Sequence, residues 1–135
     1  MATTVYDIVS RALRILGVVD PGEPLDAGDA ATAIAALNAM MRRWEANGIA
    51  LGWSDVVQGS DELPAPPEAE EAMTFNLAVR LRSEYRVAIE PDVIQMATDG
   101  LALLRRDVYI TSPLMLNIRM PGSAGRWNIY ADEPY

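Results

Sequence analysis

The chain has 135 residues, of which 50% are hydrophobic, and this suits one folded domain rather than two domains or a disordered polymer. It contains no Cys and no His, which excludes disulfide frameworks, cysteine nucleophiles, Ser–His–Asp triads and zinc sites of the usual type. The formal net charge is −8 and every basic residue is Arg, so the chain is a poor candidate for wrapping a phosphate backbone.

The N-terminus does not resemble a secretion signal. Asp7, Arg11 and Arg14 interrupt its apolar residues, so it has no signal-peptide core. No apolar run reaches the roughly 18 residues that a membrane span needs. We therefore expect a soluble protein that is made in the cytoplasm and has no membrane partner.

The first helix is predicted from its caps and its apolar spacing. Thr4 and Asp7 have the spacing of a capping box, in which a hydroxyl accepts from the amide three residues on and a carboxylate reaches back. Gly17 suits the left-handed residue that closes a helix. The apolar residues of one face are Val5, Ile8, Val9, Ala12, Leu13 and Leu16.

A second helix is expected from Asp26 to about Asn47, after a connector over 18–25 that is rich in proline and glycine. Its main apolar face is formed by Ala30, Ala33, Ile34, Leu37, Met41 and Trp44. A second face, small and apolar, is formed by Ala31, Ala35 and Ala39. A helix that is apolar on two sides usually packs between neighbours, which are either other helices of the chain or a second subunit.

Residues 49–65 are predicted to form a small β element. Ile49, Leu51 and Trp53 alternate with other residues, Val56 and Val57 follow, and glycines lie nearby. This pattern favours one or two short strands, such as a hairpin.

Two more helices are expected. Prolines at 64, 66 and 67 introduce a third, which runs to about Val87, and Pro91 opens a fourth. Beyond Thr111 further prolines and glycines rule out a long helix. The predicted fold is therefore mainly α: a bundle of about four helices over 1–111 with a small β-hairpin, followed by an extended C-terminal arm over 112–135.

The arm keeps large apolar side chains that a polar linker would lack. They are Leu114, Leu116, Ile118, Trp127, Ile129 and Tyr130. An extended apolar segment that cannot fold on itself is expected to lie in a partner's groove or beside an exposed strand. The alternative is that the segment packs back over its own helices; of the two, partner binding is our expectation.

One dense group of carboxylates, Glu68, Glu70 and Glu71, falls in the first turn of the third helix. A glycosidase needs two carboxylates across a sugar-binding cleft, but adjacent glutamates here are more typical of dipole partners on a solvated surface. There is no calcium-loop spacing and no phosphate loop, since residues 121–125 lack both a lysine and a following helix. The sequence thus indicates no catalytic residue, no metal and no cofactor.

Arginines gather on the third helix, at Arg80, Arg82 and Arg86, and on the second helix, at Arg42 and Arg43. Arginine forms bidentate bonds with carboxylates, so these side chains could pair with acidic groups of a neighbouring subunit. The alternative is an ordinary solvated face, in which Arg80 pairs with Glu84 one turn later.

Taken in order, several stretches resemble one known family. They are 3–9 (TTVYDIV) with 11–17 (RALRILG), 36–41 (ALNAMM) leading to Trp44, 72–81 (AMTFNLAVRL) and 128–130 (NIY). Together they look like the tail accessory factors of short-tailed phages, which are also called packaged-DNA stabilisation or head-completion proteins. The first helix is the most specific piece, and the resemblance covers most of the chain.

The resemblance implies a structural, non-enzymatic role at the head–tail junction of the virion. Such proteins form a ring, here expected to be dodecameric, beneath the portal protein. The ring extends the DNA channel, helps to retain the packaged DNA and receives a tail or nozzle protein. DNA would pass through it without specific binding. A muralytic enzyme that uses Glu68 or Glu71 is the alternative function.

Overall fold

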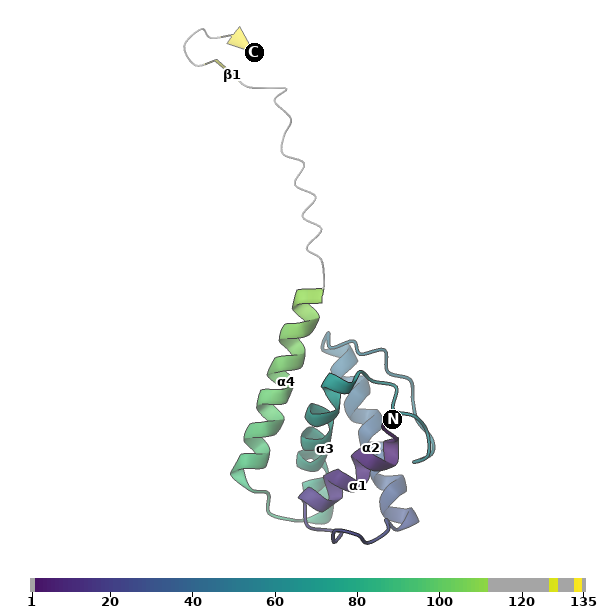
Figure 1. Cartoon of the computed structure of the whole chain (residues 1–135). Helices are drawn as coiled ribbons and strands as arrows, with labels where there is room; N and C mark the ends of the chain where they lie inside the picture. Colours follow the sequence, from purple (N-terminus) through teal and green to yellow (C-terminus); the bar gives the residue numbers. More distant parts are fainter. Residues whose placement is uncertain (1, 112–126, 129–132, 135) are drawn as a thin grey trace.

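The computed structural model describes residues 2–111, 127–128 and 133–134, with side chains as far as Asp107. The elements in chain order are α1 (Val5–Ile15), α2 (Ala27–Ala46), the 3-10 turn η1 (Pro67–Ala69), α3 (Glu70–Tyr85), α4 (Pro91–Thr111), β1 (Trp127–Asn128) and β2 (Glu133–Pro134). The two short strands pair antiparallel, with Trp127 opposite Pro134. The prediction of a mainly α bundle is confirmed (Figure 1).

The start of α1 forms the predicted capping box. The amide of Asp7 donates to the Thr4 hydroxyl, and the amide of Thr4 donates to the Asp7 carboxylate at 2.9 Å. Hydrogen bonds from the side chain and then the backbone of Thr4 hold the pKa of Asp7 below its ordinary value. Gly17 has φ +73°, the left-handed conformation that follows the helix end.

Helix α3 is the centre of the bundle, because α1, α2 and α4 all pack against it. Met73, Leu77 and Leu81 are completely buried along it. Thr74 is also buried, and its hydroxyl donates to the carbonyl of Glu70 one turn earlier at 2.8 Å. The buried threonine therefore leaves no hydroxyl unsatisfied in the core.

Helix α4 lies along the outer side of α3 and packs chiefly on that helix (Figure 1). The two backbones meet at Gly100, where an added Cβ would lie 2.9 Å from the Cβ of Ala72. Asn76 bridges the same contact, since its side-chain amide donates to the carbonyls of Ala72 and Ala97. Glycine and alanine thus allow an approach that larger residues would prevent.

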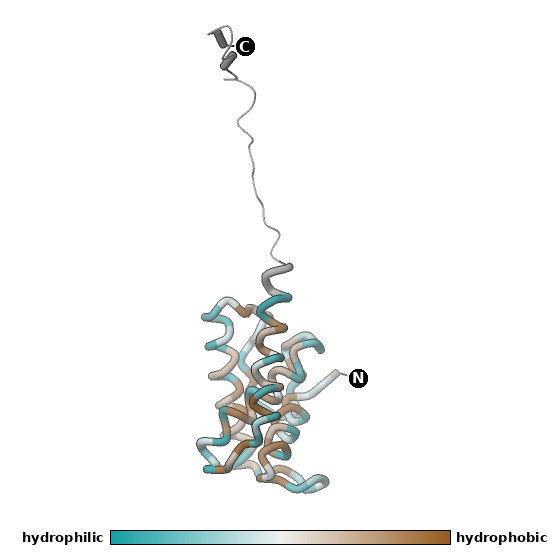
Figure 2. Tube along the Cα trace, turned by 90° about the vertical axis from the view of Figure 1, so that its left-hand side faces the viewer, coloured by the Kyte–Doolittle hydropathy of each residue, from teal (hydrophilic) through white to brown (hydrophobic). Residues whose placement is uncertain are grey.

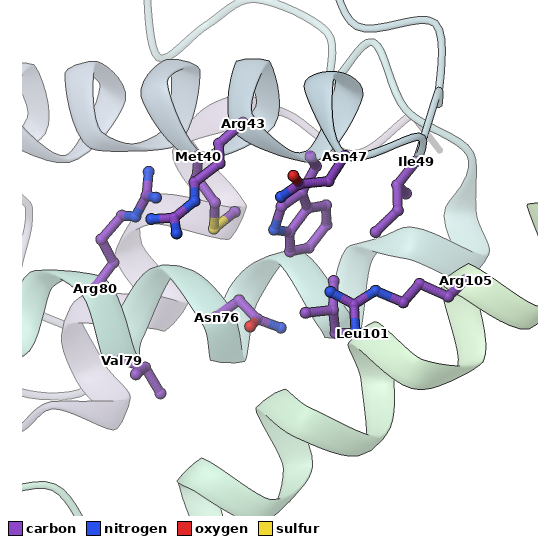
Figure 3. Close-up of a pocket in the computed structure, with 10 residues that line it drawn as sticks. Met40, Arg43, Asn47, Ile49, Asn76, Val79, Arg80, Leu101 and Arg105 are labelled. Carbon is purple, nitrogen blue, oxygen red and sulfur yellow. The ribbon is translucent and has the colours of Figure 1, made fainter.

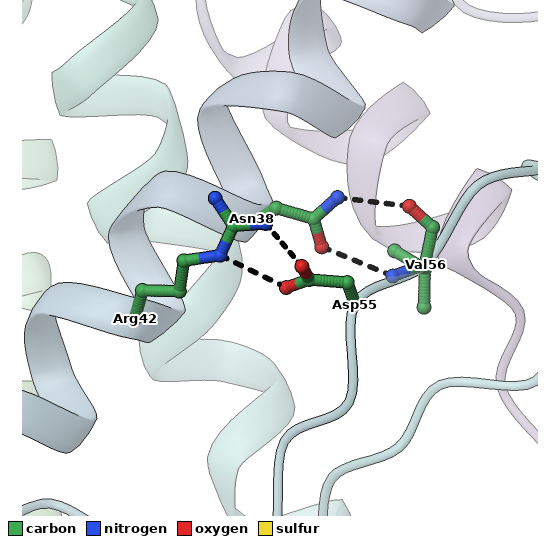
Figure 4. A network of polar contacts seen from close by, with 4 residues as sticks. All are labelled: Asn38, Arg42, Asp55 and Val56. Atoms are coloured by element: carbon green, nitrogen blue, oxygen red, sulfur yellow. Dashed lines mark hydrogen bonds and ion pairs between the residues drawn. The ribbon is translucent and has the colours of Figure 1, made fainter.

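The hairpin predicted over 49–65 is wrong, because this segment runs as irregular chain without a strand. Apart from two local turn bonds, from the Asp61 amide to the Gln58 carbonyl and from the Ala65 amide to the Leu63 carbonyl, its hydrogen bonds include several to other segments. The Asn38 side chain on α2 accepts from the Val56 amide at 3.1 Å and donates to the Val56 carbonyl at 2.8 Å (Figure 4). Beside it, Arg42 forms an ion pair with Asp55, and the Arg42 hydrogen bond holds the pKa of that carboxyl below its usual range.

The rest of the segment is held by the start of the chain. The amides of Val5 and Tyr6 donate to the carbonyls of Asp61 and Gly59, and the Leu63 amide donates to the carbonyl of Thr3. A side chain on α2 and the edge of α1 therefore take the hydrogen bonds that a second strand would have taken. The alternating apolar residues Ile49, Leu51 and Trp53 are buried or half-buried, but their backbone does not pair as a strand.

No helix in the described residues is long and apolar enough to cross a membrane. The arm predicted over 112–135 lies largely outside the described residues, and so do Leu114, Leu116, Ile118, Ile129 and Tyr130. Of the predicted partner contacts only the backbone of Trp127 is described, in β1. The boundary between core and arm remains a prediction.

Candidate interaction surfaces

The first candidate surface is a groove between α2, α3 and α4, which we call the arginine groove. Arg43 comes from α2, Arg80 from α3 and Arg105 from α4; the guanidinium groups of Arg43 and Arg80 lie near each other at one end of the groove, and that of Arg105 lies at the other end (Figure 3). Its other lining residues are Met40, Trp44, Asn47, Ile49, Asn76, Val79 and Leu101. Charge surrounded by apolar side chains is the arrangement that binds an acidic group while excluding water.

Of the residues that the structure describes, no carboxylate lines the arginine groove. Burial lowers the pKa of Arg80, and the positive charge of Arg43 lowers it further. The pairing of Arg80 with Glu84 that the sequence suggested is not formed among the described residues. The described lining of the groove therefore concentrates positive charge, with no counter-charge of its own, on an acidic protein.

The second candidate surface is a hollow between the start of α3 and the middle of α4, which we call the acidic hollow. Glu68, Glu71 and Asp99 supply its charge, and within the described part of the chain no basic residue lines it. The remaining lining residues are Ala72, Met96, Gly100 and Leu103. Asp99 also accepts from the side-chain amide of Gln95 at 2.9 Å. Met96 is 48% exposed and Leu103 52%, so apolar surface lies open beside the carboxylates.

The predicted subunit-interface residues do not all fall in one place. Among the arginines of α3, Arg80 lies in the groove, whereas Arg82 and Arg86 are exposed and do not line it. Arg86 instead caps α3 in the left-handed conformation, with φ 54°. A further group, Ala31, Ala35 and Ala39, is exposed on α2. Within the described part of the chain no other helix covers these alanines, and their contact with a second subunit remains a prediction.

Sequence reasoning missed Arg43 and Arg105 as partners of Arg80. The sequence set Arg42 and Arg43 beside the arginines of the third helix as possible contacts for a partner's acidic groups, and it placed Arg105 and Arg106 near a helix end. It gave no indication of which of these side chains share one groove. Arg42 turns away to Asp55 while Arg43 enters the groove. Neighbours on a helix point about 100° apart, and only packing decides which of them meets another helix.

The described residues contain no group of three or more acidic, histidine or cysteine side chains arranged to hold a metal ion. Glu68 and Glu71 line the acidic hollow, and Glu70, half-buried, does not. Exposed Met96 and Leu103 stand beside the carboxylates of the hollow, which suits contact with another protein surface better than a sugar-binding cleft.

The family model described as P22 tail accessory factor matches residues 1–135, the whole chain. This match confirms the resemblance seen in the first helix and in the stretches that follow it. No curated protein matches the chain.

Proposed function

The chain belongs to the family of the P22 tail accessory factor, a family of structural phage-tail components, and on that premise we propose that it is a head-to-tail adaptor subunit. Copies form a ring under the portal protein, extend the DNA channel, help to retain the packaged DNA and receive the next tail or nozzle protein. The observation that carries this proposal is the family match over the full length of the chain.

Features of the chain support an assembly role. The arginine groove and the acidic hollow are open, charged and partly apolar, and neither has a counter-charge among its own lining residues. In the proposed complex the segment 112–135 contacts the portal protein, with Leu114, Leu116 and Ile118 as the first apolar contacts and Trp127, Ile129 and Tyr130 as the later ones. Large apolar side chains in a proline-rich segment are typical of peptides that bind in grooves.

Passage of DNA is consistent with the charge of the chain. At a formal net charge of −8 the ring repels the phosphate backbone, so the duplex slides without being held. Binding of duplex DNA by the purified protein at physiological salt, measured by fluorescence anisotropy, would contradict this part of the proposal.

The adaptor role is tested by the mass of the purified protein, alone and mixed with its cognate portal protein, measured by light scattering or native mass spectrometry. The full chain should join the portal in a ring-sized complex. A variant truncated after Thr111 should remain folded by circular dichroism and should fail to join. No association of the full chain under any condition would refute the adaptor role.

The second candidate function is that of a muralytic enzyme, and the observation that favours it is the group of carboxylates in the acidic hollow. The double variant Glu68→Gln and Glu71→Gln separates the two functions. An adaptor should still join the portal, whereas a hydrolase should lose nearly all cleavage of purified peptidoglycan. Peptidoglycan cleavage by the wild-type chain that disappears in this variant would establish the enzyme.

A further inference from the structure

We propose that the arginine groove of one copy receives the acidic hollow of the next copy, so that the two flanks of α4 form the two halves of a head-to-tail subunit contact. The inference rests on the proposed ring and specifies the surfaces that build it. It starts from the distribution of charge around α4, the helix that packs chiefly on a single neighbour.

The two surfaces lie on opposite flanks of α4. Val93, Ala97 and Leu104 are buried against α3 and mark the inner face of the helix. At about 100° per residue, Leu101 and Arg105 fall on one side of that face, toward the groove. Asp99 and Leu103 fall on the other side, within the hollow, as Met96 does. A neighbour on each side of α4 can therefore be contacted at once.

The charges of the two surfaces are complementary. The groove presents Arg43, Arg80 and Arg105, and the hollow presents Glu68, Glu71 and Asp99. None of the three arginines pairs with a carboxylate in the described part of the chain. Arginine binds carboxylate through two parallel hydrogen bonds, and such pairs fix the orientation of an interface as well as adding affinity.

Apolar side chains accompany the charges on both sides. Met96 and Leu103 stand exposed at the hollow, whereas Ile94, which is 41% exposed, falls on the groove side of the same helix. Figure 2, in which α4 faces the viewer, shows hydrophobic residues among hydrophilic ones along this helix. In the groove Trp44 and Leu101 offer the opposing apolar surface. Burial of these side chains supplies favourable energy, while the charge pairs set the register.

The geometry favours a ring over a two-fold dimer. A two-fold contact built on either surface alone would set arginines against arginines or carboxylates against carboxylates, and like charges disfavour association. A contact between the groove of one copy and the hollow of the next leaves one unoccupied groove and one unoccupied hollow at the two ends of every open oligomer. Such a contact adds copies one after another, and it gives a ring when the rotation between neighbouring copies closes.

The experiment uses two charge-reversed variants of the full chain with its cognate portal protein. The first, Arg43→Glu with Arg105→Glu, makes the groove acidic, and the second, Glu71→Arg with Asp99→Arg, makes the hollow basic. Each variant alone should need at least about tenfold more protein than wild type to fill the portal, because one charge set is repelled. An equimolar mixture should restore the ring, because each reversed surface now meets a complementary partner.

Matched controls carry the same net charges away from both surfaces. Arg11→Glu with Arg14→Glu on α1 controls for the first variant. Asp20→Arg with Glu23→Arg, in the connector before α2, controls for the second. All four positions are exposed, and both control variants should fill the portal as wild type does. Circular dichroism melts of every variant establish that it is folded.

The outcomes separate the contact from the function. If wild type fills the portal and each charge-reversed variant alone fills it equally well, the proposed contact is overturned and the adaptor role stands. Reversed variants that fail alone, with no rescue in the mixture, show that the portal itself occupies one of the surfaces, which also overturns the contact. A wild-type chain that joins no portal overturns the adaptor role, and the contact that rests on it.

Discussion

Helices α1 and α4 use their apolar residues in different ways. In α1 the inward residues are buried, including Val5 and Leu13, which have no exposed surface, and both ends of the helix are capped. Among the α4 side chains that the structure describes, up to Asp107, only Val93, Ala97 and Leu104 are buried, while large apolar residues stand on the flanks. The apolar face of α1 is covered by other segments of the same chain, whereas α4 has more apolar surface than α3 covers.

This difference distinguishes the side chains that stabilise the fold from the exposed ones that are available to bind another protein. A helix that is needed only for stability has little reason to expose leucine and methionine, because exposed apolar surface favours association with other proteins. A contact helix at the edge of a bundle can expose them without loss of its core. Four predictions test this division, from the largest expected effect to the smallest.

The largest effect is expected from truncating a buried leucine of α1. Leu13→Ala should lower the free energy of unfolding by about 2–5 kcal/mol, because the change removes packed methyl groups and leaves a cavity. Leu103→Ala on α4 should change it by no more than about 0.5 kcal/mol. Urea denaturation followed by circular dichroism measures both. Equal losses of unfolding free energy in the two variants would contradict the proposed difference between α1 and α4.

The next effect concerns the close contact of α4 with α3. Gly100→Ala should reduce stability by about 1 kcal/mol or more, because the new methyl would meet Ala72 and overpacking outweighs a gain of about 1 kcal/mol in helix propensity. Adding Ala72→Gly should recover part of the loss in a double-mutant cycle. A Gly100→Ala variant more stable than wild type would mean that the helices are less closely packed than described.

The cap of α1 should contribute a smaller amount. Thr4→Ala should cost about 1 kcal/mol near neutral pH, since it removes the hydroxyl that caps the helix. The pKa of Asp7 is lowered in the folded protein, so this carboxylate stabilises the fold above its ordinary value of 3.8 and loses that contribution as the pH falls below it. The pKa of Asp7 in the variant, followed by NMR titration, should rise towards 3.8. An unchanged pKa would exclude the Thr4 side chain as the main cause of the shift.

The smallest effect is expected at the end of α3, just before the chain turns into α4. The Tyr85 hydroxyl donates to Asp29 of α2 at 2.7 Å, and burial followed by this hydrogen bond raises the pKa of Tyr85 from 10.0 to about 12. The neutral phenol therefore stabilises the fold below pH 10, and that contribution is lost as the pH rises towards 12. Tyr85→Phe should unfold more easily than wild type at pH 9 and should show less alkaline loss. Parallel stability curves from pH 9 to 12 for the two proteins would contradict this role.

Local signals in the sequence predicted the helices well. Thr4 with Asp7, Asp26 before α2 and Pro91 at the start of α4 identified the starts, because caps depend on residues only a few positions apart. The same local reasoning failed over 49–65. There the hydrogen-bond partner of Val56 is Asn38, and no alternation of residues can reveal a partner that comes from a different helix.

The sequence by itself determined the helical content, the starts of the helices, the acidic charge, the absence of cysteine and histidine chemistry, and the family. Tertiary structure alone decided that Arg43, Arg80 and Arg105 meet in one groove, and that Glu68, Glu71 and Asp99 meet in another hollow. Caps and periodicity act within one or two turns of a helix, so they can be read along the chain. The convergence of charges from different helices depends on crossing and rotation, which packing across the whole core decides.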